Sequence, residues 1–507
     1  MSTSEVDVYD GAGASLMIRP DSSEAEPASE PSTGQLDRIA EEVGHLLARV
    51  EHGRFAEAVF RGRLKAEKAW WQHAHEGSLL EAVTRSFQVR HLLLRSAESD
   101  GTWRNALSYI GDLHPEDDQV CTYDYDRAEV RFKETSPLAR PYDWVNGAHL
   151  DVSSWYTRNG MCGITAWLIA VARMGAKASQ KYCVLTNRLY HETDLLFQMA
   201  RLQDVEVRVF DDVSQIIDAA ASIDMPATIF LDSSRPDGDA AAVRRTLEVV
   251  DADKVACVVW DNTCAPAHDH PFDERLRSSD LPVSLILIRS HAKLDQLGLE
   301  FTSLGSIVQL TRKDASSAVR HWHTSMKYLL SDAIAVSGAC ASPATLRLLA
   351  ALGLPAPQLA VRGNECLRAA NILGAAVLIE TMHGKKGYRI EENVHRCFVE
   401  IHIDDLAAPK PIGGPMTWPI WDDLDEELTQ IVKRSADQDI PVWKSASFGF
   451  HYTGLSWYAS DNPPRPHDCA HTVLRVCFGM HDPAQTQAVA RIISSQLMAK
   501  EQWRAPE

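Results

Sequence analysis

The feature that most constrains the fold is a series of short apolar runs separated by helical stretches in the middle of the chain. Six runs end at polar or turn residues: KYCVLT (181–186), VEVRVF (205–210), ATIFLD (227–232), VACVVWD (255–261), VSLILIRS (283–290) and GSIVQL (305–310). Stretches with helical periodicity, such as 214–223 and 239–250, lie between several of them. Near-continuous apolar strands that alternate with helices predict an α/β fold with a mostly parallel sheet covered on both faces.

The chain divides into four expected parts. Residues 1–35 are rich in Ser, Glu, Pro and Asp, which predicts a disordered tail. Residues 36–120 predict a helical N-terminal extension, because apolar residues recur there at three- and four-residue spacing. Residues 121–342 hold the apolar runs and form the expected large α/β domain. Residues 343–507 mix helical and strand patterns, which predicts a smaller C-terminal α+β domain.

Composition and charge argue against several classes of protein. The formal net charge of -18 disfavours a nucleic-acid or anionic-membrane partner, and no apolar run approaches the length of a spanning helix. The ten cysteines are scattered without a Cys-x-x-Cys pair, which predicts free thiols and a cytoplasmic location. The pairs His268/His270 and His321/His323 have no evident third ligand, so no metal site is expected.

Two ionisable residues follow neighbouring apolar runs. Asp261 ends the run 255–261, and Lys293 comes just after the run 283–290. Ligands of open α/β sheets bind at the carboxyl ends of the strands. A lysine there can form a Schiff base with an aldehyde cofactor, and an aspartate can keep a pyridine nitrogen protonated. Taken alone, both residues would be interpreted as solvated loop residues. The functional interpretation therefore depends on the sequence around them.

Six short motifs lie in order along the chain: Asn159-Gly160-Met161, Tyr190 to Thr193, Asp261-Asn262-Thr263, Ser290-His291-Ala292-Lys293, Ser447-Phe448-Gly449 and the arginine Arg475. Together they resemble the Cys/Met-metabolism family of pyridoxal 5′-phosphate (PLP) enzymes, the group of cystathionine γ-synthase, cystathionine lyases and methionine γ-lyase. In that family the first five motifs read Ser-Gly-Met, Tyr-Gly-Gly-Thr, Asp-Asn-Thr, Ser-x-Thr-Lys and Ser-Leu-Gly, and the resemblance runs from about residue 123 to 483. The resemblance implies the fold type I, or aspartate aminotransferase-like, architecture.

The resemblance also implies PLP as the cofactor and a role for each residue. Lys293 would hold PLP as a Schiff base and act as the catalytic base, and Asp261 would pair with the pyridine nitrogen. Tyr190 would stack on the ring and serve as a second acid or base. Further cofactor contacts would come from Gly160, Met161 and Ser290, and from Tyr125 and Arg127 of a neighbouring subunit; Arg475 and Ser447 would bind the substrate.

Several departures from the family pattern mark a divergent member. Ala292 replaces a phosphate-binding threonine. The family's Pro-x-Asn-Pro, whose asparagine faces the phenolic oxygen of the cofactor, is DSSRPD here, and Arg235 stands near that asparagine. A cation at this place would change the electronics of the cofactor. The helical block 36–113 has no counterpart in the usual family core.

The expected activity is γ-elimination from a γ-substituted amino acid. The N-terminal extension and the altered cofactor contacts suggest the propargylglycine synthase branch, which forms a terminal alkyne from a γ-chloro-alkenyl amino acid such as 4-chloro-allylglycine. The alternatives are a cystathionine- or methionine-type γ-lyase or γ-synthase, an aminotransferase or decarboxylase, and a non-catalytic PLP-fold binding protein. The resemblance further implies a homo-oligomer, dimer or tetramer, with active sites shared between subunits.

Overall fold

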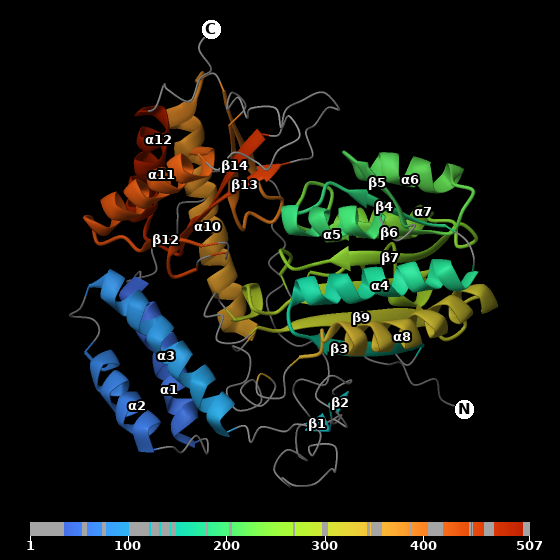
Figure 1. Ribbon diagram of the computed structural model, residues 1–507, viewed down its shortest axis with the longest axis horizontal. Helices are drawn as coiled ribbons and strands as arrows, with labels where there is room; N and C mark the ends of the chain where they lie inside the picture. Colours follow the sequence, from blue (N-terminus) through green and yellow to red (C-terminus); the bar gives the residue numbers. More distant parts are fainter. Residues whose placement is uncertain are drawn as a thin grey trace.

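The computed structural model describes most of the chain (Figure 1). It covers residues 35–52, 58–73, 78–100, 121–122, 131–132, 142, 145, 149–178, 181–201, 205–266, 269–296, 303–341, 345, 357–385, 387–403, 419–445, 448, 450–460 and 471–499. Of the expected disordered tail, only Gln35 is described, and it is the first residue of a helix. The boundaries of the four expected parts remain predictions.

A seven-stranded sheet forms the centre of the large α/β part. Its strands are β3 (Leu150–Thr157), β4 (Tyr182–Asn187), β5 (Val205–Phe210), β6 (Ala227–Asp232), β7 (Val255–Asp261), β8 (Ser284–Ser290) and β9 (Gly305–Arg312), in the order β3-β9-β8-β7-β6-β4-β5. The pairs between β8 and β5 are parallel, and β9 is antiparallel to both of its neighbours. All six apolar runs form strands, so the predicted α/β fold with a mostly parallel sheet is confirmed.

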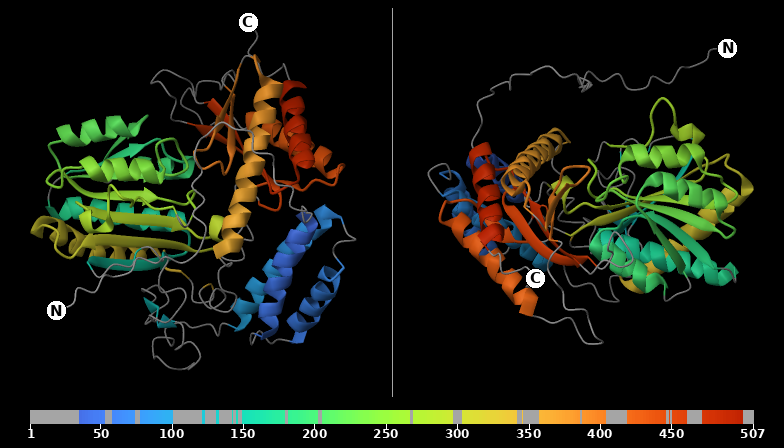
Figure 2. Two further views of the ribbon diagram at one scale, coloured as in Figure 1. Left: turned by 180° about the vertical axis from the view of Figure 1, so that it is seen from behind. Right: turned by 90° about the horizontal axis from the view of Figure 1, so that it is seen from above.

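Different helices cover the two faces of this sheet (Figures 1 and 2). One face packs against α4 (Gly160–Ala178), α5 (His191–Arg201) and α8 (Ser317–Ser337), and the other against α6 (Val213–Ser222) and α7 (Ala240–Val249). The alternation of side chains along a strand explains the division. In β6, Phe230 meets the Trp167 ring of α4 at 5.3 Å between centroids. Its neighbours Ile229 and Leu231 belong to the opposite core, together with Val243 of α7.

The C-terminal part contains a second, mostly antiparallel sheet. Its strands are β10 (Tyr388–Glu392), β11 (Val399–Ile403), β12 (Val442–Lys444), β13 (Thr453–Ser460) and β14 (His471–Cys477), in the order β10-β11-β14-β13-β12. It shares a core with α10 (Pro357–Met382), α11 (Pro419–Ala436) and α12 (Pro483–Ala499). Among the described residues, no helix combines the length and the apolar character needed to cross a membrane.

Three N-terminal helices pack on the C-terminal part (Figure 1). They are α1 (Gln35–His52), α2 (Ala58–Trp71) and α3 (Leu79–Asp100), and a two-residue pair, β1 (Cys121–Thr122) with β2 (Arg131–Phe132), follows them. The Phe87 ring contacts the rings of Trp443 and Tyr452 edge-on, at 5.9 and 5.5 Å between centroids. Just ahead of α3, the Ser78 hydroxyl donates a 2.5 Å hydrogen bond to Asp439. Aromatic packing and this contact fix the helices beside the second sheet.

Gly305 lies where β3, β8 and the segment before α4 approach one another closely. It pairs with Thr157 of β3 and Ser290 of β8, and a Cβ atom at position 305 would lie 2.4 Å from the carbonyl of Asn159. We therefore expect Gly305→Ala to displace the start of α4 and to lower the free energy of unfolding by about 1–3 kcal/mol. Gly44→Ala, in open space on α1, is the control and should be neutral or slightly stabilising. Denaturant titrations that find both variants as stable as the wild type would contradict this packing.

Candidate active site

A pocket of about 280 Å³ lies at the carboxyl ends of β6, β7 and β8. Its walls bring together seven residues that the sequence singled out: Gly160, Met161, Tyr190, Asp261, Ser290, Lys293 and Arg475. The first six come from the large α/β part, and Arg475 comes from β14 of the second sheet. Three other expected site residues, Tyr125, Arg127 and Ser447, lie outside the described residues.

The N-terminus of α4 forms one end of the pocket. The Asn159 side chain accepts a 2.7 Å hydrogen bond from the backbone N–H of Cys162 and so caps the first turn. Gly160 allows this turn to approach β8, because a Cβ atom there would lie 3.0 Å from the Cβ atom of Ser290. The backbone N–H of Ser290 in turn donates to the Thr263 hydroxyl at 3.0 Å. First-turn N–H groups and a serine hydroxyl at one helix end suit a phosphate.

Two buried carboxylates lie side by side at the ends of β6 and β7. Asp232 and Asp261 are partners in the strand register. The Asp232 carboxylate accepts hydrogen bonds from the backbone N–H groups of Tyr190 and Ser234, both at 2.8 Å. Asp261 accepts from the N–H and the hydroxyl of Thr263, at 3.0 and 2.6 Å. Burial, and then the charge of Asp232, raises the pKa of Asp261 to about 7. Such a pair favours a cationic group in the pocket.

Lys293 stands in a turn that a buried ion pair fixes. The guanidinium of Arg289, at the end of β8, binds Asp295 through two hydrogen bonds of 2.6 and 2.7 Å. The His291 Nδ1 atom lies 2.6 Å from the same carboxylate. Burial alone would raise the pKa of Asp295, but Arg289 and His291 outweigh it and hold the pKa below its usual range. Between these anchors, the Lys293 ammonium lies 5.9 Å from the centre of the Phe448 ring.

Arg475 and Tyr190 form the opposite wall. Arg475 is 2% exposed and donates a 2.8 Å hydrogen bond to the Tyr190 hydroxyl. Its guanidinium carbon lies 5.2 Å from the centre of the Tyr190 ring and 5.6 Å from that of Phe398. Burial raises the pKa of Tyr190 and outweighs the lowering effect of Arg475. The phenol therefore remains protonated at neutral pH, beside a guanidinium suited to a carboxylate.

A thiol also lines the pocket. Cys264 is 3% exposed, and its backbone N–H donates a 3.0 Å hydrogen bond to the Ser233 hydroxyl. Burial raises the pKa of this thiol well above its ordinary value. Burial likewise raises the pKa of Cys162, beside the first turn of α4. Both thiols are thus protonated at neutral pH, which makes them poor nucleophiles.

Arg235, expected to face the cofactor, is not among the described residues that line the pocket. Its guanidinium binds the Glu400 carboxylate at 2.5 Å and donates to the backbone carbonyl of Leu189 at 3.1 Å. A third contact reaches the Tyr458 hydroxyl at 3.4 Å. These partners turn the side chain toward the second sheet. Its neighbour Ser234 lines the pocket instead, and the buried Ser234 hydroxyl has no hydrogen-bond partner among the described residues.

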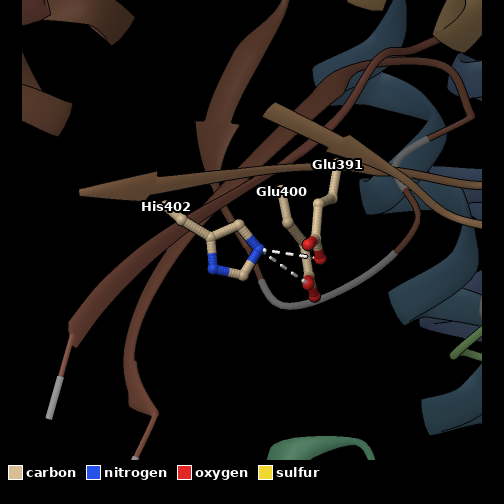
Figure 3. A group of neighbouring side chains, drawn as sticks. All are labelled: Glu391, Glu400 and His402. Atoms are coloured by element: carbon tan, nitrogen blue, oxygen red, sulfur yellow. Dashed lines mark ion pairs between the residues drawn. The ribbon is translucent and has the colours of Figure 1, made fainter. Parts of the chain in front are cut away.

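The carboxylate that holds Arg235 belongs to a polar group on β10 and β11 (Figure 3). The His402 Nε2 atom lies 3.1 Å from Glu391 and 3.7 Å from Glu400. One nitrogen and two carboxylate oxygens are ligand types that a divalent cation accepts. However, Arg235 already pairs with Glu400, and Arg389 pairs with Glu391. Because each carboxylate is opposed by a guanidinium, we interpret this group as an ion-pair network.

Several residues of the pocket wall had no individual role predicted from the sequence. Asn159 was quoted only as part of a motif, and Asp232, Ser234 and Glu192 were given no role. Asp232 carried the same signal as Asp261, since it is the last residue of an apolar run. Asn159 and Glu192 belong to matched motifs. Ser234 is held by a contact with a distant segment, the side chain of Asn393, and no local pattern in the sequence distinguishes it from an ordinary polar residue.

Comparison with known proteins finds distantly similar solved structures but no matching family. No protein-family model matches the chain, and no curated protein matches it. A methionine γ-lyase from Micromonospora echinospora is 17% identical, with a TM-score of 0.40 over 68% of this chain and 81% of that chain. A cystathionine γ-synthase from Xanthomonas oryzae pv. oryzae, in complex with cystathionine, is 15% identical, with a TM-score of 0.40 over 68% and 82%. At this distance, function has to be argued from the residues of the pocket.

The raised pKa of Asp261 predicts that this carboxylate lowers the stability of the ligand-free protein at neutral pH, although it favours binding of a cationic ligand. Without a cationic ligand, Asp261 is protonated up to about pH 7 in the folded protein but ionises near 3.8 in the unfolded chain. The unfolded chain binds fewer protons between these values, so stability falls as pH rises from 4 to 7. We expect ligand-free Asp261→Asn to exceed the wild type in stability by up to about 4 kcal/mol at pH 8, and by less at pH 5.

Melting temperatures of the ligand-free proteins at pH 5 and pH 8 check this expectation. Glu248→Gln, an exposed carboxylate on α7, is the control and should change little at either pH. An Asp261→Asn protein less stable than the wild type at pH 8 would show that the carboxylate is not under strain.

Proposed function

We propose that the chain is a PLP-dependent enzyme that removes or replaces a group on the side chain of an amino acid, at the γ-carbon. The observation that carries the proposal is the convergence of Lys293, Asp261, Tyr190 and Arg475 on one pocket, beside the N-terminus of α4. These groups come from separate segments and both sheets. A pocket that gathers a lysine, a buried carboxylate, a phenol, a guanidinium and a helix end is suited to a phosphorylated pyridine aldehyde and an amino acid.

The residues present fit each part of the proposed cofactor. Lys293 is the amine for the aldehyde. The Asp261 carboxylate is suited to a protonated pyridine nitrogen, whose positive charge would offset the burial and the charge of Asp232 that raise its pKa. The first turn of α4 and the Ser290 hydroxyl suit the phosphate. Ser234, whose hydroxyl is buried and unpartnered within the described part of the chain, is better placed than Arg235 to meet the phenolic oxygen. When bound, PLP supplies an electron sink for a carbanion next to the amino group.

The side chains then divide the remaining work. Arg475 binds the α-carboxylate, because its buried planar guanidinium offers paired donors. The Lys293 amine removes the α-proton. Tyr190 acts as the second proton-handling group, and its raised pKa makes it a donor to a leaving group at neutral pH. Departure of a γ-substituent needs protons removed at both Cα and Cβ, whereas transamination needs only the Cα position. Two proton-handling side chains in one pocket favour the γ-route.

Hydrogen exchange with an unreactive amino acid tests this proposal. We expect the PLP-loaded protein to introduce deuterium from heavy water at both Cα and Cβ of norvaline, as measured by NMR. Lys293→Ala should reduce exchange at both carbons by at least about a hundredfold, since a positioned base contributes on that scale. Lys327→Ala, an exposed lysine on α8, should exchange at the wild-type rate. Exchange limited to Cα would leave transamination or β-elimination, and the absence of exchange would contradict the proposal.

The finer proposal is alkyne formation from a γ-chloro-alkenyl amino acid. Its support is the departure from the family pattern at Ala292, and at Ser234 where the family has an asparagine near the phenolic oxygen. With 4-chloro-allylglycine, chloride release without ammonia would support it. Release of ammonia and a 2-oxo acid instead would favour an ordinary γ-lyase, whose substrates carry sulfur.

We also propose a homo-oligomer, dimer or tetramer, whose subunits share their active sites. Arg475 is the only arginine among the described lining residues, and its proposed partner is the substrate carboxylate. A phosphate then has no guanidinium unless one comes from elsewhere, and the YDYDR segment with Tyr125 and Arg127 is the candidate. We expect Lys293→Ala and Arg127→Ala each to be inactive, and their mixture to recover about a quarter of wild-type activity after subunit exchange. A mixture that stays inactive would place Arg127 in the same subunit as Lys293, and an Arg127→Ala protein that is active by itself would place Arg127 outside the site.

A further inference from the structure

Not every charged residue of the pocket has a role under the proposed function. The described lining contains five of them: Glu192, Asp232, Asp261, Lys293 and Arg475. Under the proposed function, Lys293 and Asp261 serve the cofactor and Arg475 serves the α-carboxylate. Both oxygens of Asp232 accept backbone hydrogen bonds. Glu192 is left over, as an acid with no role in cofactor binding or proton transfer.

Glu192 is an exposed side chain that also lines the pocket, so it stands at the pocket mouth. It follows Tyr190 by two residues, where the resembling motif Tyr-Gly-Gly-Thr has a glycine. Burial raises the pKa of Tyr190, and the negative charge of Glu192 adds to that rise. The carboxylate is therefore within electrostatic reach of the phenol that contacts Arg475. Its own charge is not paired with any described residue by a hydrogen bond or ion pair.

The neighbour of Glu192 does not neutralise it. Burial, and then the nearby guanidinium groups of Arg475 and Arg235, lowers the pKa of His191 to about 4. His191 is therefore uncharged at neutral pH, and its ring stacks on Tyr458 at 4.5 Å between centroids. With Arg475 and Lys293 occupied, the described lining has no cation for a second anionic group of a substrate.

Interaction with the helix dipole does not fully explain an acid at position 192. It lies in the first turn of α5, where any acid interacts favourably with the helix dipole. Asp194 supplies the same interaction in the same turn, and it does not line the pocket. The dipole therefore accounts for an acid in this turn but not for a second acid directed at the pocket mouth.

We propose that Glu192 selects the side chain of the substrate: it admits amino acids whose side chain ends in a neutral or cationic group and rejects those that end in a carboxylate or phosphate. The inference rests on the proposed function, because it needs Arg475 to be occupied by the α-carboxylate. An anionic side-chain terminus would then meet Glu192 at the pocket mouth without a compensating cation. A neutral alkenyl or a distal ammonium group would not.

Binding of two isosteric amino acids to the PLP-loaded protein tests the inference without requiring turnover. L-Glutamine and L-glutamate differ only in the charge of the side-chain terminus, and L-ornithine carries a cation at similar reach. We expect the calorimetric dissociation constant to be about tenfold lower for glutamine than for glutamate, since two like charges a few ångströms apart near a protein surface repel each other on that energy scale. Ornithine should bind at least as tightly as glutamine.

Variants separate Glu192 from general electrostatics. Glu192→Gln should reduce the preference for glutamine to about twofold or less, and Glu192→Lys should reverse it. Asp194→Asn removes an equal charge from the same helical turn and should leave the preference intact. Equal binding of glutamine and glutamate by the wild type, or an unchanged preference in Glu192→Gln, would overturn the inference alone. If none of the three amino acids binds, the proposed function fails as well.

Discussion

The buried ion pair between Arg289 and Asp295 is the interaction on which the pocket depends. Arg289 is fully buried, so each of its donors must be satisfied within the protein. Two reach Asp295, and another reaches the backbone carbonyls of Asn262 and Ala265. One guanidinium thus ties the end of β8 to the loop after β7 and to the turn that follows Lys293. Removing any partner would leave an uncompensated charge in the interior, so these segments keep one arrangement.

The pocket is closed by contacts between the two sheets. Arg475 of β14 hydrogen-bonds to Tyr190, ahead of α5, and Arg235 binds Glu400 of β11. Arg475 and Glu400 are partners in the register of β11 and β14, so both contacts originate from one position along the second sheet. A movement of one sheet relative to the other would break them together. The two sides of the pocket are therefore held in one arrangement by both contacts.

The features that the sequence predicted are those that depend on local residue patterns. Apolar runs located the strands, and the rule that ligands bind at strand ends located Asp261 and Lys293. Arg235, expected near the cofactor, is absent from the described pocket lining, because its orientation depends on Glu400, which lies 165 positions further along the chain. A shift of one residue in the loop after β6 presents Ser234 to the pocket instead. The orientation of such side chains depends on residues that come into contact only in the folded protein. A single sequence contains no local pattern that predicts these contacts.

The buried thiol of Cys264 has a chemical consequence for an enzyme of the proposed kind. Eliminations create carbon–carbon double bonds conjugated to electron-poor groups, and such products alkylate thiolates. A cysteine thiolate in the wall of the pocket would then be alkylated by the product. Because burial keeps this thiol protonated, it contributes volume and polarisability without nucleophilicity. The Cys264 side chain can thus line the pocket without being alkylated by the product, and the enzyme would not be inactivated by its own reaction.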